Sequence, residues 1–354
     1  MRWPAEHLAS AGHDVTSVLP ADRHFRMDID RTGRVHRVYL PPGTDVVVLQ
    51  RVTHPFLASA IPAMRAQGVA VVVDIDDDLS CIHPENPAFI SLHPKSVGVM
   101  QDNGVRNQHS WRHLQTACRD ATLVTVSTAA LLDRYGYGHG RLLPNRLPDA
   151  YYGLCRADSD VIGWPAALQT HPDDPTAVGP AVARLVAAGA TFRVVGFPAG
   201  VGRAFGMPDW RGDETCRPVP LEEYPAAVAR IGIGIAPLAD TRFNAAKSAL
   251  KILEMSACGV PWVASPRVEY RKLHTEGAGL LADRPKDWYR LLRDLRNNPA
   301  RRAELSEAGR AVAENHRLRD HAWRWLEAWA DALRLERQHR TPLGQHRPTP
   351  AVVT

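Results

Sequence analysis

The chain has 354 residues, of which 45% are apolar and 23% are charged, a composition typical of folded globular proteins rather than of disordered chains. This length is sufficient for two domains, each with its own core. A net charge of +5 and a pI near 9.1 suit phosphate-bearing ligands, a nucleic acid or an anionic membrane surface, and select none of them.

Several classes of protein are disfavoured by simple counts. No apolar run approaches the roughly 20 residues that a membrane-spanning helix needs, and residues 1–14 lack the basic-then-apolar pattern of a signal peptide. The five cysteines are scattered and form no C-x-x-C pair, so neither a disulfide framework nor a zinc site is indicated. We therefore expect a cytoplasmic protein without a transmembrane segment.

The first half of the chain alternates two patterns. Short β-branched runs predict strands, and helical periodicity lies between them. Continuous apolar strands separated by helices predict a parallel sheet that is covered on both faces. The predicted strands are residues 13–19, 45–49, 69–75 and 122–126, and the predicted helices are residues 4–11, 55–67 and 111–119.

Four carboxylates follow the strand predicted for residues 69–75. Asp74, Asp76, Asp77 and Asp78 lie where open α/β sheets bind ligands, at the carboxyl end of a strand. A solvated turn and helix N-cap explain the run equally well. A strand that ends in D-x-D also resembles the haloacid-dehalogenase phosphatase signature, with Asp74 as nucleophile and Asp76 as acid. Asp78 departs from that signature, because Thr or Val is expected there.

The pattern is interrupted at residues 142–154 by two prolines, an asparagine and two tyrosines, which predicts a domain boundary. The second half then repeats the alternation and predicts a second parallel sheet. Its predicted strands are residues 161–164, 192–196, 231–237 and 262–264, and its helices are residues 176–188 and 222–230. Residues 316–337 predict a long amphipathic helix. The proline-containing tail, residues 338–354, is expected to be disordered.

Residues 237–265 carry the most informative pattern: a loop, a helix, a Gly-Val-Pro turn and a strand. Asn244 is the predicted helix N-cap. Lys247, Lys251 and Glu254 are spaced by four and three, so they share one helical face. A helix N-terminus with a lysine has the basic features of an anion-binding site. A carboxylate later in the same helix can accept hydrogen bonds from a ribose. The same three residues are also compatible with an ordinary solvated face.

This segment resembles the donor-binding helix of group 1 (family 4) glycosyltransferases, which have the GT-B fold. Glu254 precedes a small-small-Gly-x-Pro stretch, as does the family's Glu that contacts the ribose of a nucleotide-sugar. The family's usual earlier Glu is Ala246 here. A sub-branch of similar enzymes carries a Phe-Asn, Lys-Ser, Lys, Glu pattern, which is matched by Phe243, Asn244, Lys247, Ser248, Lys251 and Glu254.

The loop after the first strand of the second half supports the same resemblance. The sub-branch has a pattern close to Gly-Trp-x-Gly-Ser, then Thr-His, then Asp. Residues 166 and 167 are alanines where that pattern has Gly-Ser, so the backbone offers donor phosphates a less open approach. The matching residues are Gly163, Trp164, Thr170, His171 and Asp173.

The resemblance implies an α/β fold of two Rossmann-like parallel-sheet domains (GT-B). Residues 1–147 would form an acceptor-side domain and residues 148–315 a nucleotide-sugar-binding domain. Residues 316–337 would form a helix that crosses back to the first domain. A GT-B first domain normally opens with a strand and a Gly-rich loop, whereas this chain begins inside a predicted helix. Either the N-terminus is abbreviated or the true start lies upstream.

The resemblance also implies a reaction, the transfer of a sugar from a nucleotide-diphosphate sugar to an acceptor hydroxyl with retention of anomeric configuration. The expected catalytic residues are Lys247, Glu254, Asp76 and Asp77. Asn244, Lys247 and Lys251 would stabilise the leaving phosphate, and Glu254 would hold the ribose. Trp164, His171 and Ser248 would complete the donor site, and Asp76, Asp77 and Asp78 the acceptor side. No metal and no cofactor besides the donor are expected.

Alternatives stay open at this stage. The absent earlier Glu and the absent first strand are compatible with a non-catalytic or weakly catalytic protein that binds a sugar-nucleotide or glycan. The basic pI is compatible with a glycosyltransferase that acts on modified DNA bases. The phosphatase is a remote alternative, because it does not account for the second half. The acceptor, whether glycan, protein or modified DNA, is not specified by the sequence.

Overall fold

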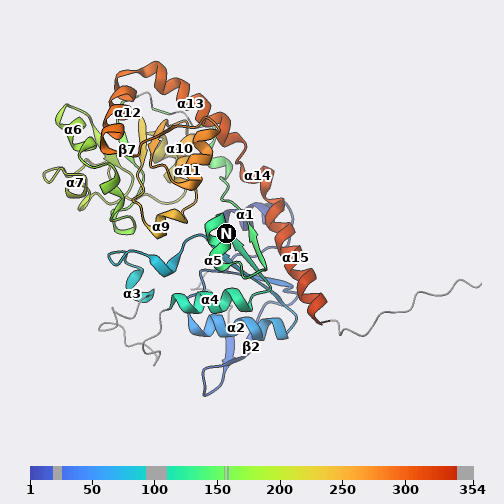
Figure 1. Cartoon of the computed structure of the whole chain (residues 1–354). Helices are drawn as coiled ribbons and strands as arrows, with labels where there is room; N and C mark the ends of the chain where they lie inside the picture. The colour runs from blue at the N-terminus through green and yellow to red at the C-terminus, as the bar shows by residue number, and fades with distance from the viewer. Residues whose placement is uncertain (19–25, 93–109, 155, 158, 341–354) are drawn as a thin grey trace, which may run out of the picture.

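Two parallel sheets form the framework of the two lobes in the computed structural model, which describes residues 1–18, 26–92, 110–154, 156–157 and 159–340 (Figure 1). The first lobe holds a four-stranded sheet of order β3-β4-β5-β6, and every strand pair in it is parallel. Its strands are β3 (Val46–Gln50), β4 (Ala70–Ile75), β5 (Leu123–Val126) and β6 (Gly140–Leu142). Its helices are α1 (Arg2–Ser10), α2 (Pro55–Ala66), α3 (Phe89–Leu92), α4 (Trp111–Asp120) and α5 (Ala129–Tyr135).

The second lobe holds a five-stranded parallel sheet of order β11-β10-β9-β7-β8. Its strands are β7 (Ile162–Trp164), β8 (Phe192–Val194), β9 (Ile233–Ala236), β10 (Trp262–Ala264) and β11 (Leu280–Leu281). Its helices are α6 (Ala181–Ala187), α7 (Val201–Ala204), α8 (Tyr224–Ala229), α9 (Arg242–Ala245), α10 (Leu250–Ala257), α11 (Val268–Thr275), α12 (Pro285–Asn297) and α13 (Pro299–Glu314). Two doubly covered parallel sheets confirm the predicted fold class.

Strand β4 shows why both faces of the first sheet are buried. Successive side chains of a strand point to opposite faces, and all six residues of β4 are buried. Val71 and Val73 belong to the core under α2 and α4, whereas Ala70 and Val72 belong to the core on the opposite face. A strand that is apolar at every position therefore requires cover on both sides.

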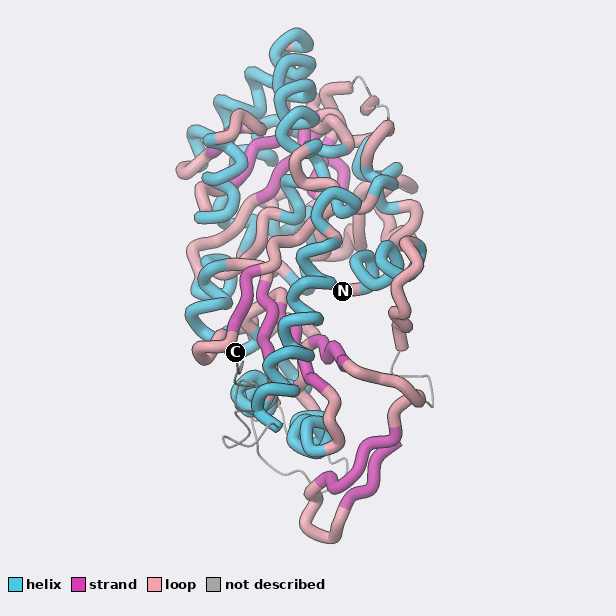
Figure 2. The backbone as a smooth tube through the Cα atoms, turned by 90° about the vertical axis from the view of Figure 1, so that its right-hand side faces the viewer, coloured by secondary structure: helices cyan, strands magenta, loops and turns pink. Residues whose placement is uncertain are grey.

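The chain returns to the first lobe at its end. Helices α14 (Leu318–His321) and α15 (Trp323–Arg340) follow α13, and α15 lies across the first sheet (Figure 2). Trp325 and Trp329 pack there with Ala70 and Val72. One helix was expected over residues 316–337, but the structure breaks it at Ala322 and continues α15 to Arg340. Residues 338–340 are thus helical rather than disordered, and residues 341–354 of the expected tail lie outside the described part.

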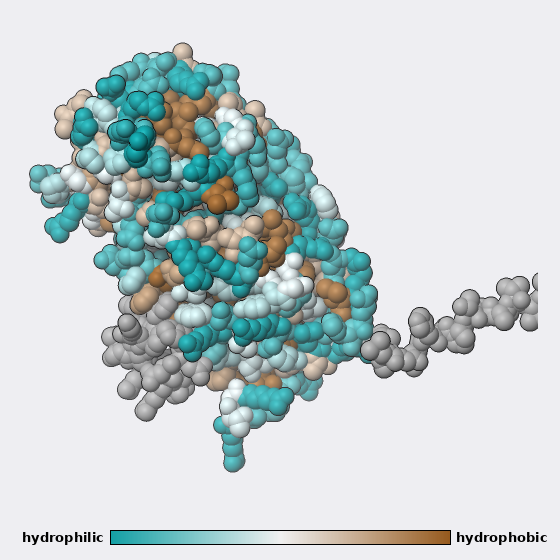
Figure 3. Space-filling model, viewed as in Figure 1, coloured by the Kyte–Doolittle hydropathy of each residue, from teal (hydrophilic) through white to brown (hydrophobic). Residues whose placement is uncertain are grey.

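The N-terminal part of the first lobe differs from the prediction. Residues 13–18 of the strand expected at 13–19 are not a strand, because they lie exposed with no neighbouring strand to pair with, and residue 19 is not described. Instead β1 (Arg26–Ile29) and β2 (Val35–Tyr39) form an antiparallel hairpin that packs against α2. The hairpin projects from the lower lobe and is mainly hydrophilic on the face in view (Figure 3). Within the described residues, none of the helices has the length and apolar composition needed to span a bilayer.

Candidate active site between the two lobes

The segment before α10 does not form the single helix that the sequence predicts. Helix α9 ends at Ala245 and α10 begins at Leu250, so Lys247 lies in a non-helical connection before α10. Two contacts with the first lobe hold this connection: Thr128 donates to the carbonyl oxygen of Ala246 at 3.0 Å, and Asn145 donates to Ser248 at 3.0 Å. The break is therefore a tertiary effect that helical periodicity cannot report.

Asn244 is not the N-cap of the lysine-bearing helix. It lies inside α9, whose cap is Thr241, and it is buried at 4% exposure. Its side-chain amide donates to Asp174 at 2.6 Å and to the carbonyl oxygen of Ala239 at 3.1 Å. Asn244 thus fixes the loop after β9, and the expectation that its cap would stabilise a phosphate is wrong.

Asp174 connects His171 to the same loop. The His171 ring nitrogen Nδ1 lies 2.9 Å from the Asp174 carboxylate, which also accepts from the backbone N–H of Ala239. Burial lowers the pKa of His171 although the carboxylate opposes that change. His171 lies in the loop between β7 and α6, and the charge of Lys251 lowers its pKa further.

Lys247 reaches across from the second lobe to the first. Its Nζ lies 2.7 Å from Asp77 Oδ1 and 4.4 Å from the centre of the Phe243 ring. The side chains of Lys247 and Asp77 are 19% and 20% exposed, so water screens this ion pair less than one on the open surface. Lys247 and Asp77, two residues of the predicted site, are 170 positions apart in the chain and in contact in the structure.

Lys251 and Glu254 occupy a buried part of α10. Lys251 donates to the carbonyl oxygen of Pro165 at 2.9 Å, and Tyr151 donates its hydroxyl to Glu254 Oε1 at 2.8 Å. Burial raises the pKa of Glu254, although the Tyr151 hydrogen bond and the Lys251 charge oppose it, and burial lowers the pKa of Lys251. The carboxylate and ammonium are thus held ready to exchange hydrogen bonds with polar ligand groups.

In the first lobe, Arg51 organises the acidic run. Its guanidinium binds both oxygens of Asp76 at 2.7 and 2.6 Å, and Asp77 lies at 3.4 Å. Burial favours the neutral acid, but the hydrogen bonds and charge of Arg51 outweigh it and hold the pKa of Asp76 below its usual value. Arg51 itself has a φ of 52°, a strained conformation for a residue with a side chain. Asp76 is thereby a paired carboxylate and a weak base.

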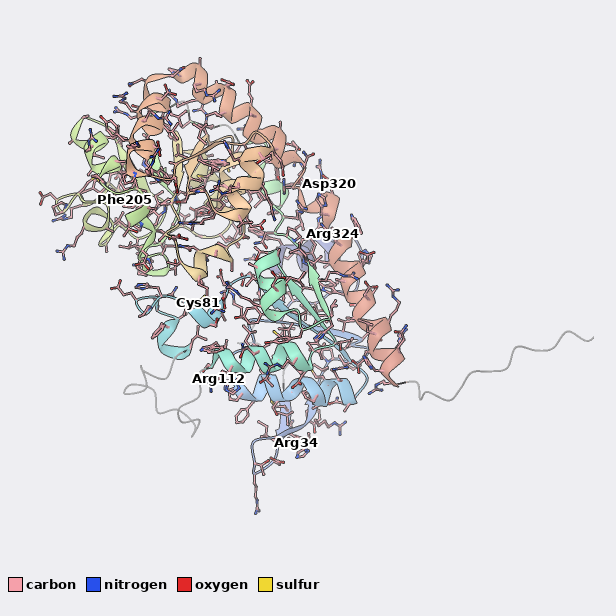
Figure 4. All side chains as sticks on the ribbon, viewed as in Figure 1. Arg34, Cys81, Arg112, Phe205, Asp320 and Arg324 are labelled. Atoms are coloured by element: carbon pink, nitrogen blue, oxygen red, sulfur yellow. The ribbon has the colours of Figure 1, made fainter. Side chains whose placement is uncertain are left out.

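Asp78 is not on the acceptor side of the cleft. Its carboxylate is fully buried and accepts from Ser80, from the Tyr135 hydroxyl at 2.6 Å and from Arg134. It also caps the short helix η1 (Leu79–Cys81). At the end of η1, Cys81 lies where the first lobe faces α9 (Figure 4). Of the interpretations weighed for the run, the N-cap is correct for Asp78.

Asp74 opens onto a cavity between the lobes. The cavity measures about 140 Å³ and is bounded by the ends of β3, β4 and β6, by α1 and by Leu250. Asp74 accepts from the Thr125 hydroxyl at 2.7 Å, and burial raises its pKa to about 6. Asp74 and Asp76 of the first lobe and Leu250 at the start of α10 therefore line the same cavity.

Two further residues predicted to bind the donor, Trp164 and Ser248, have surroundings that differ from those of Lys247, Lys251 and Glu254. Trp164 is 1% exposed and packs edge-on against Phe205, with ring centres 5.2 Å apart. Its side chain is part of the core of the second lobe, and its contact with the donor stays a prediction. Ser248 instead lies at the lobe boundary, where it accepts from Asn145.

Sequence reasoning missed several residues that position the site. Tyr151 belongs to the helix η3 (Asp149–Tyr151) in the boundary segment, yet its hydroxyl reaches Glu254 across 103 positions of sequence. Arg51 and Asp174 have no motif of their own. Only the position of Arg51 two residues after the strand predicted for residues 45–49 could have suggested a role.

Comparison with known proteins identifies the architecture. Residues 177–327 match the protein-family model described as glycosyl transferase-like, which is less than half of the chain. Among curated proteins, no sequence matches the chain.

Solved structures resemble nearly the whole chain. Sucrose-phosphate synthase from Thermosynechococcus elongatus superposes with a TM-score of 0.58 at 15% identity, over 93% of this chain and 92% of the other. HepE from Anabaena, in complex with UDP-glucose, gives a TM-score of 0.55 at 14% identity, over 80% and 79%. TarM from S. aureus gives 0.55 at 12% identity, over 88% and 64%. The chain has the GT-B fold, and the family match supports a glycosyltransferase.

Proposed function

We propose that this protein transfers a sugar from a nucleotide-diphosphate sugar to an acceptor hydroxyl, in the manner of group 1 (family 4) glycosyltransferases. The observation that carries the proposal is the contact of Lys247 in the second lobe with Asp77 in the first. Lys251 and Glu254 follow in α10, where they are held by Pro165 and Tyr151. Basic groups and a buried carboxylate on one side of a cleft suit a diphosphate and a ribose. The UDP-glucose in the HepE complex supports a donor of this class.

In the proposed reaction the bond between the anomeric carbon and the diphosphate oxygen breaks, and a bond to the acceptor oxygen forms. Lys247 stabilises the charge that develops on the leaving diphosphate, which is the usual largest contribution in such catalysis. Glu254 holds the ribose, with Lys251 and His171 beside it. The proton of the acceptor hydroxyl passes to the leaving diphosphate, and anomeric configuration is retained.

Asp76 and Asp77 have a positioning role in this proposal. Asp76 is held by Arg51 and Asp77 by Lys247, so each carboxylate already has a cationic partner. They orient these cations toward the cleft rather than act as a general base. Since their charges are compensated, we expect transfer without a bound metal. The cysteines that the structure describes, Cys81, Cys118, Cys216 and Cys258, are free thiols, which supports a cytoplasmic location.

The phosphatase alternative finds no support in the fold, because a D-x-D site in the first lobe leaves the whole second sheet without a role. Two measurements distinguish the remaining alternatives from the proposal: turnover of the nucleotide-sugar, and the salt dependence of acceptor binding. A binding protein would hold a nucleotide-sugar without releasing the nucleoside diphosphate. A glycosyltransferase that acts on modified DNA would bind its acceptor with an affinity that falls steeply as salt rises.

The first test is a thermal-shift panel of UDP-, GDP-, ADP- and dTDP-sugars, with the wild type, Lys247→Ala and Lys286→Ala. Lys286 is exposed on α12 and serves as the matched control. Binding to the native state raises Tm by mass action. We expect one nucleotide family to raise Tm in the wild type and in the control but not in Lys247→Ala. A panel without any shift, or a shift that persists in Lys247→Ala, would contradict the proposed donor site.

A further inference from the structure

Arg146 is an arginine without a counter-ion at the wall of the cavity between the lobes. It lies two residues after Pro144 in the boundary segment and lines the same 140 Å³ cavity as Asp74. Its exposure is intermediate. In the described part of the chain, no carboxylate lies within ion-pair distance of its guanidinium.

The hydrogen bonds of Arg146 are also incomplete. One nitrogen lies 2.5 Å from His316 Nδ1, and the buried Nε has no partner among the described residues. A guanidinium has five N–H donors in a fixed fork, so most donors of Arg146 have no acceptor within the part of the chain that the structure describes. An unsatisfied buried donor on a charged group is costly, and a bound ion is one of the explanations for such a group.

The surroundings of Arg146 add positive charge. Burial lowers its pKa, and the charge of Arg324 lowers it further. Arg324 lies near the beginning of α15, at the level where the two lobes meet (Figure 4). The charge of Glu276 opposes this lowering of the pKa, and the Glu276 carboxylate lies 3.7 Å from His316 Nε2. Arg146 thus has Arg324 and His316 as neighbours. The two carboxylates of the cavity wall, Asp74 and Asp76, already accept from Thr125 and Arg51, which leaves Arg146 available to an anion.

The rest of the cavity wall is suited to hydroxyl groups. Gln50, Asp74 and Asn145 present an amide, a carboxylate and a second amide, which are donors and acceptors for hydroxyls. The indole rings of Trp3 and Trp325 form apolar wall. At about 140 Å³ the cavity is smaller than the roughly 300 Å³ at which sites for drug-sized ligands begin, so a single ring fits its size better than a polymer.

We propose that the acceptor is a monosaccharide-sized molecule that carries a phosphate or carboxylate group, and that Arg146 binds this group in the cavity. The inference rests on the proposed function, because it assigns the acceptor of the same reaction. Asp74 and Asn145 bind hydroxyls of the ring, and the planar fork of Arg146 binds the anionic group through two parallel hydrogen bonds.

The test measures binding of small probes to the 354-residue chain by titration calorimetry. The probes are glucose, galactose and mannose, their 6-phosphates, the corresponding uronates and inorganic phosphate. The proteins are the wild type, Arg146→Gln and the control Arg34→Gln, whose arginine is exposed on the β1–β2 hairpin. We expect at least one 6-phosphate or uronate to bind, and Arg146→Gln to weaken it roughly 10- to 100-fold, as loss of a charge-assisted hydrogen bond predicts. The 6-phosphate and uronate arms distinguish the two kinds of anion.

Several results would overturn this inference. One is that neutral sugars bind as tightly as their anionic forms. Another is that inorganic phosphate binds as tightly as every sugar phosphate. A third is that Arg146→Gln binds the anionic sugars as tightly as the wild type. If Arg146→Gln does not fold, the comparison of neutral with anionic probes in the wild type still decides. UDP is titrated in parallel: UDP binding that Lys247→Ala abolishes, without binding of any anionic sugar, refutes the acceptor while leaving the donor site intact.

Discussion

Removal of the Tyr151 hydroxyl tests the buried network around Glu254. Tyr151→Phe keeps the ring, which packs edge-on against Trp3 with centres 5.9 Å apart, and deletes only the donor to Glu254 Oε1. This is the one side-chain hydrogen bond of Glu254 among the described residues, and Glu254 is 8% exposed. A hydrogen bond to a buried charged group contributes about 1.5–3 kcal/mol, so we expect the free energy of unfolding to fall by that amount at pH 8.

The size of this loss depends on pH with a definite sign. Burial raises the pKa of Glu254 in the folded state, so the stability linked to its protonation is present at low pH and is lost as pH rises through the folded value. The Tyr151 hydrogen bond opposes that rise, and Tyr151→Phe raises the pKa further. We therefore expect a smaller loss at pH 5, where Glu254 is protonated in both proteins, than at pH 8.

Urea unfolding followed by tryptophan fluorescence at pH 5 and pH 8 measures this difference. Tyr152→Phe is the matched control, because its hydroxyl donates to a neutral group, the carbonyl oxygen of Ala313, at 2.9 Å. That loss is expected to be about 1 kcal/mol and the same at both pH values. Equal losses for Tyr151→Phe at pH 5 and pH 8, or a loss no larger than that of the control, would refute a buried carboxylate that depends on Tyr151.

Three further predictions concern the core, the cavity and metal ions. Trp164→Phe should leave donor affinity unchanged, whereas Trp164→Ala should lower the free energy of unfolding by about 3–5 kcal/mol. If Trp164→Phe binds the donor more weakly at unchanged stability, the indole belongs to the donor site instead. Asp74 has its pKa raised to about 6 by burial, so Asp74→Asn should stabilise the fold at pH 8 by up to ~3 kcal/mol and not at pH 4, and chemical unfolding at both values checks this. Because Asp76 and Asp77 have cationic partners, release of nucleoside diphosphate should proceed at the same rate with EDTA as with Mg²⁺. A release rate that falls with EDTA and is restored by Mg²⁺ would contradict the proposal.

The regular part of the fold was predictable because it depends on local pattern. Residues 70–75 are apolar at nearly every position, and the structure buries all six of them between two layers of helices. The turn after α10 was also predictable. Gly259 adopts a φ of 70°, a left-handed conformation that favours glycine at a helix C-terminus, and β10 follows directly. The hairpin of β1 and β2 was not predicted, because its inward residues acquire their partners only from α2.

For the site, the residue types were predictable and their surroundings were not. Lys247, Lys251 and Glu254 matched a pattern, but the pattern implied one continuous helix. Contacts with the first lobe interrupt that helix before Leu250 and direct Lys247 toward Asp77. In the same way, the four aspartates of residues 74–78 form one cluster in the sequence, yet Asp78 is a buried cap and Asp76 is an ion-pair partner.

The sequence by itself determined the alternation of strands and helices, the division into two sheets and the candidate donor segment, because each of these depends on periodicity or on a short contiguous pattern. Only the tertiary structure decided which carboxylates are paired, which tryptophan is core, and that Arg146 has no carboxylate within ion-pair distance among the described residues. Those properties depend on neighbours far away in the chain: Tyr151 to Glu254 spans 103 positions and Lys247 to Asp77 spans 170. Burial and charge compensation arise only when such segments meet, and they set the chemistry of each group.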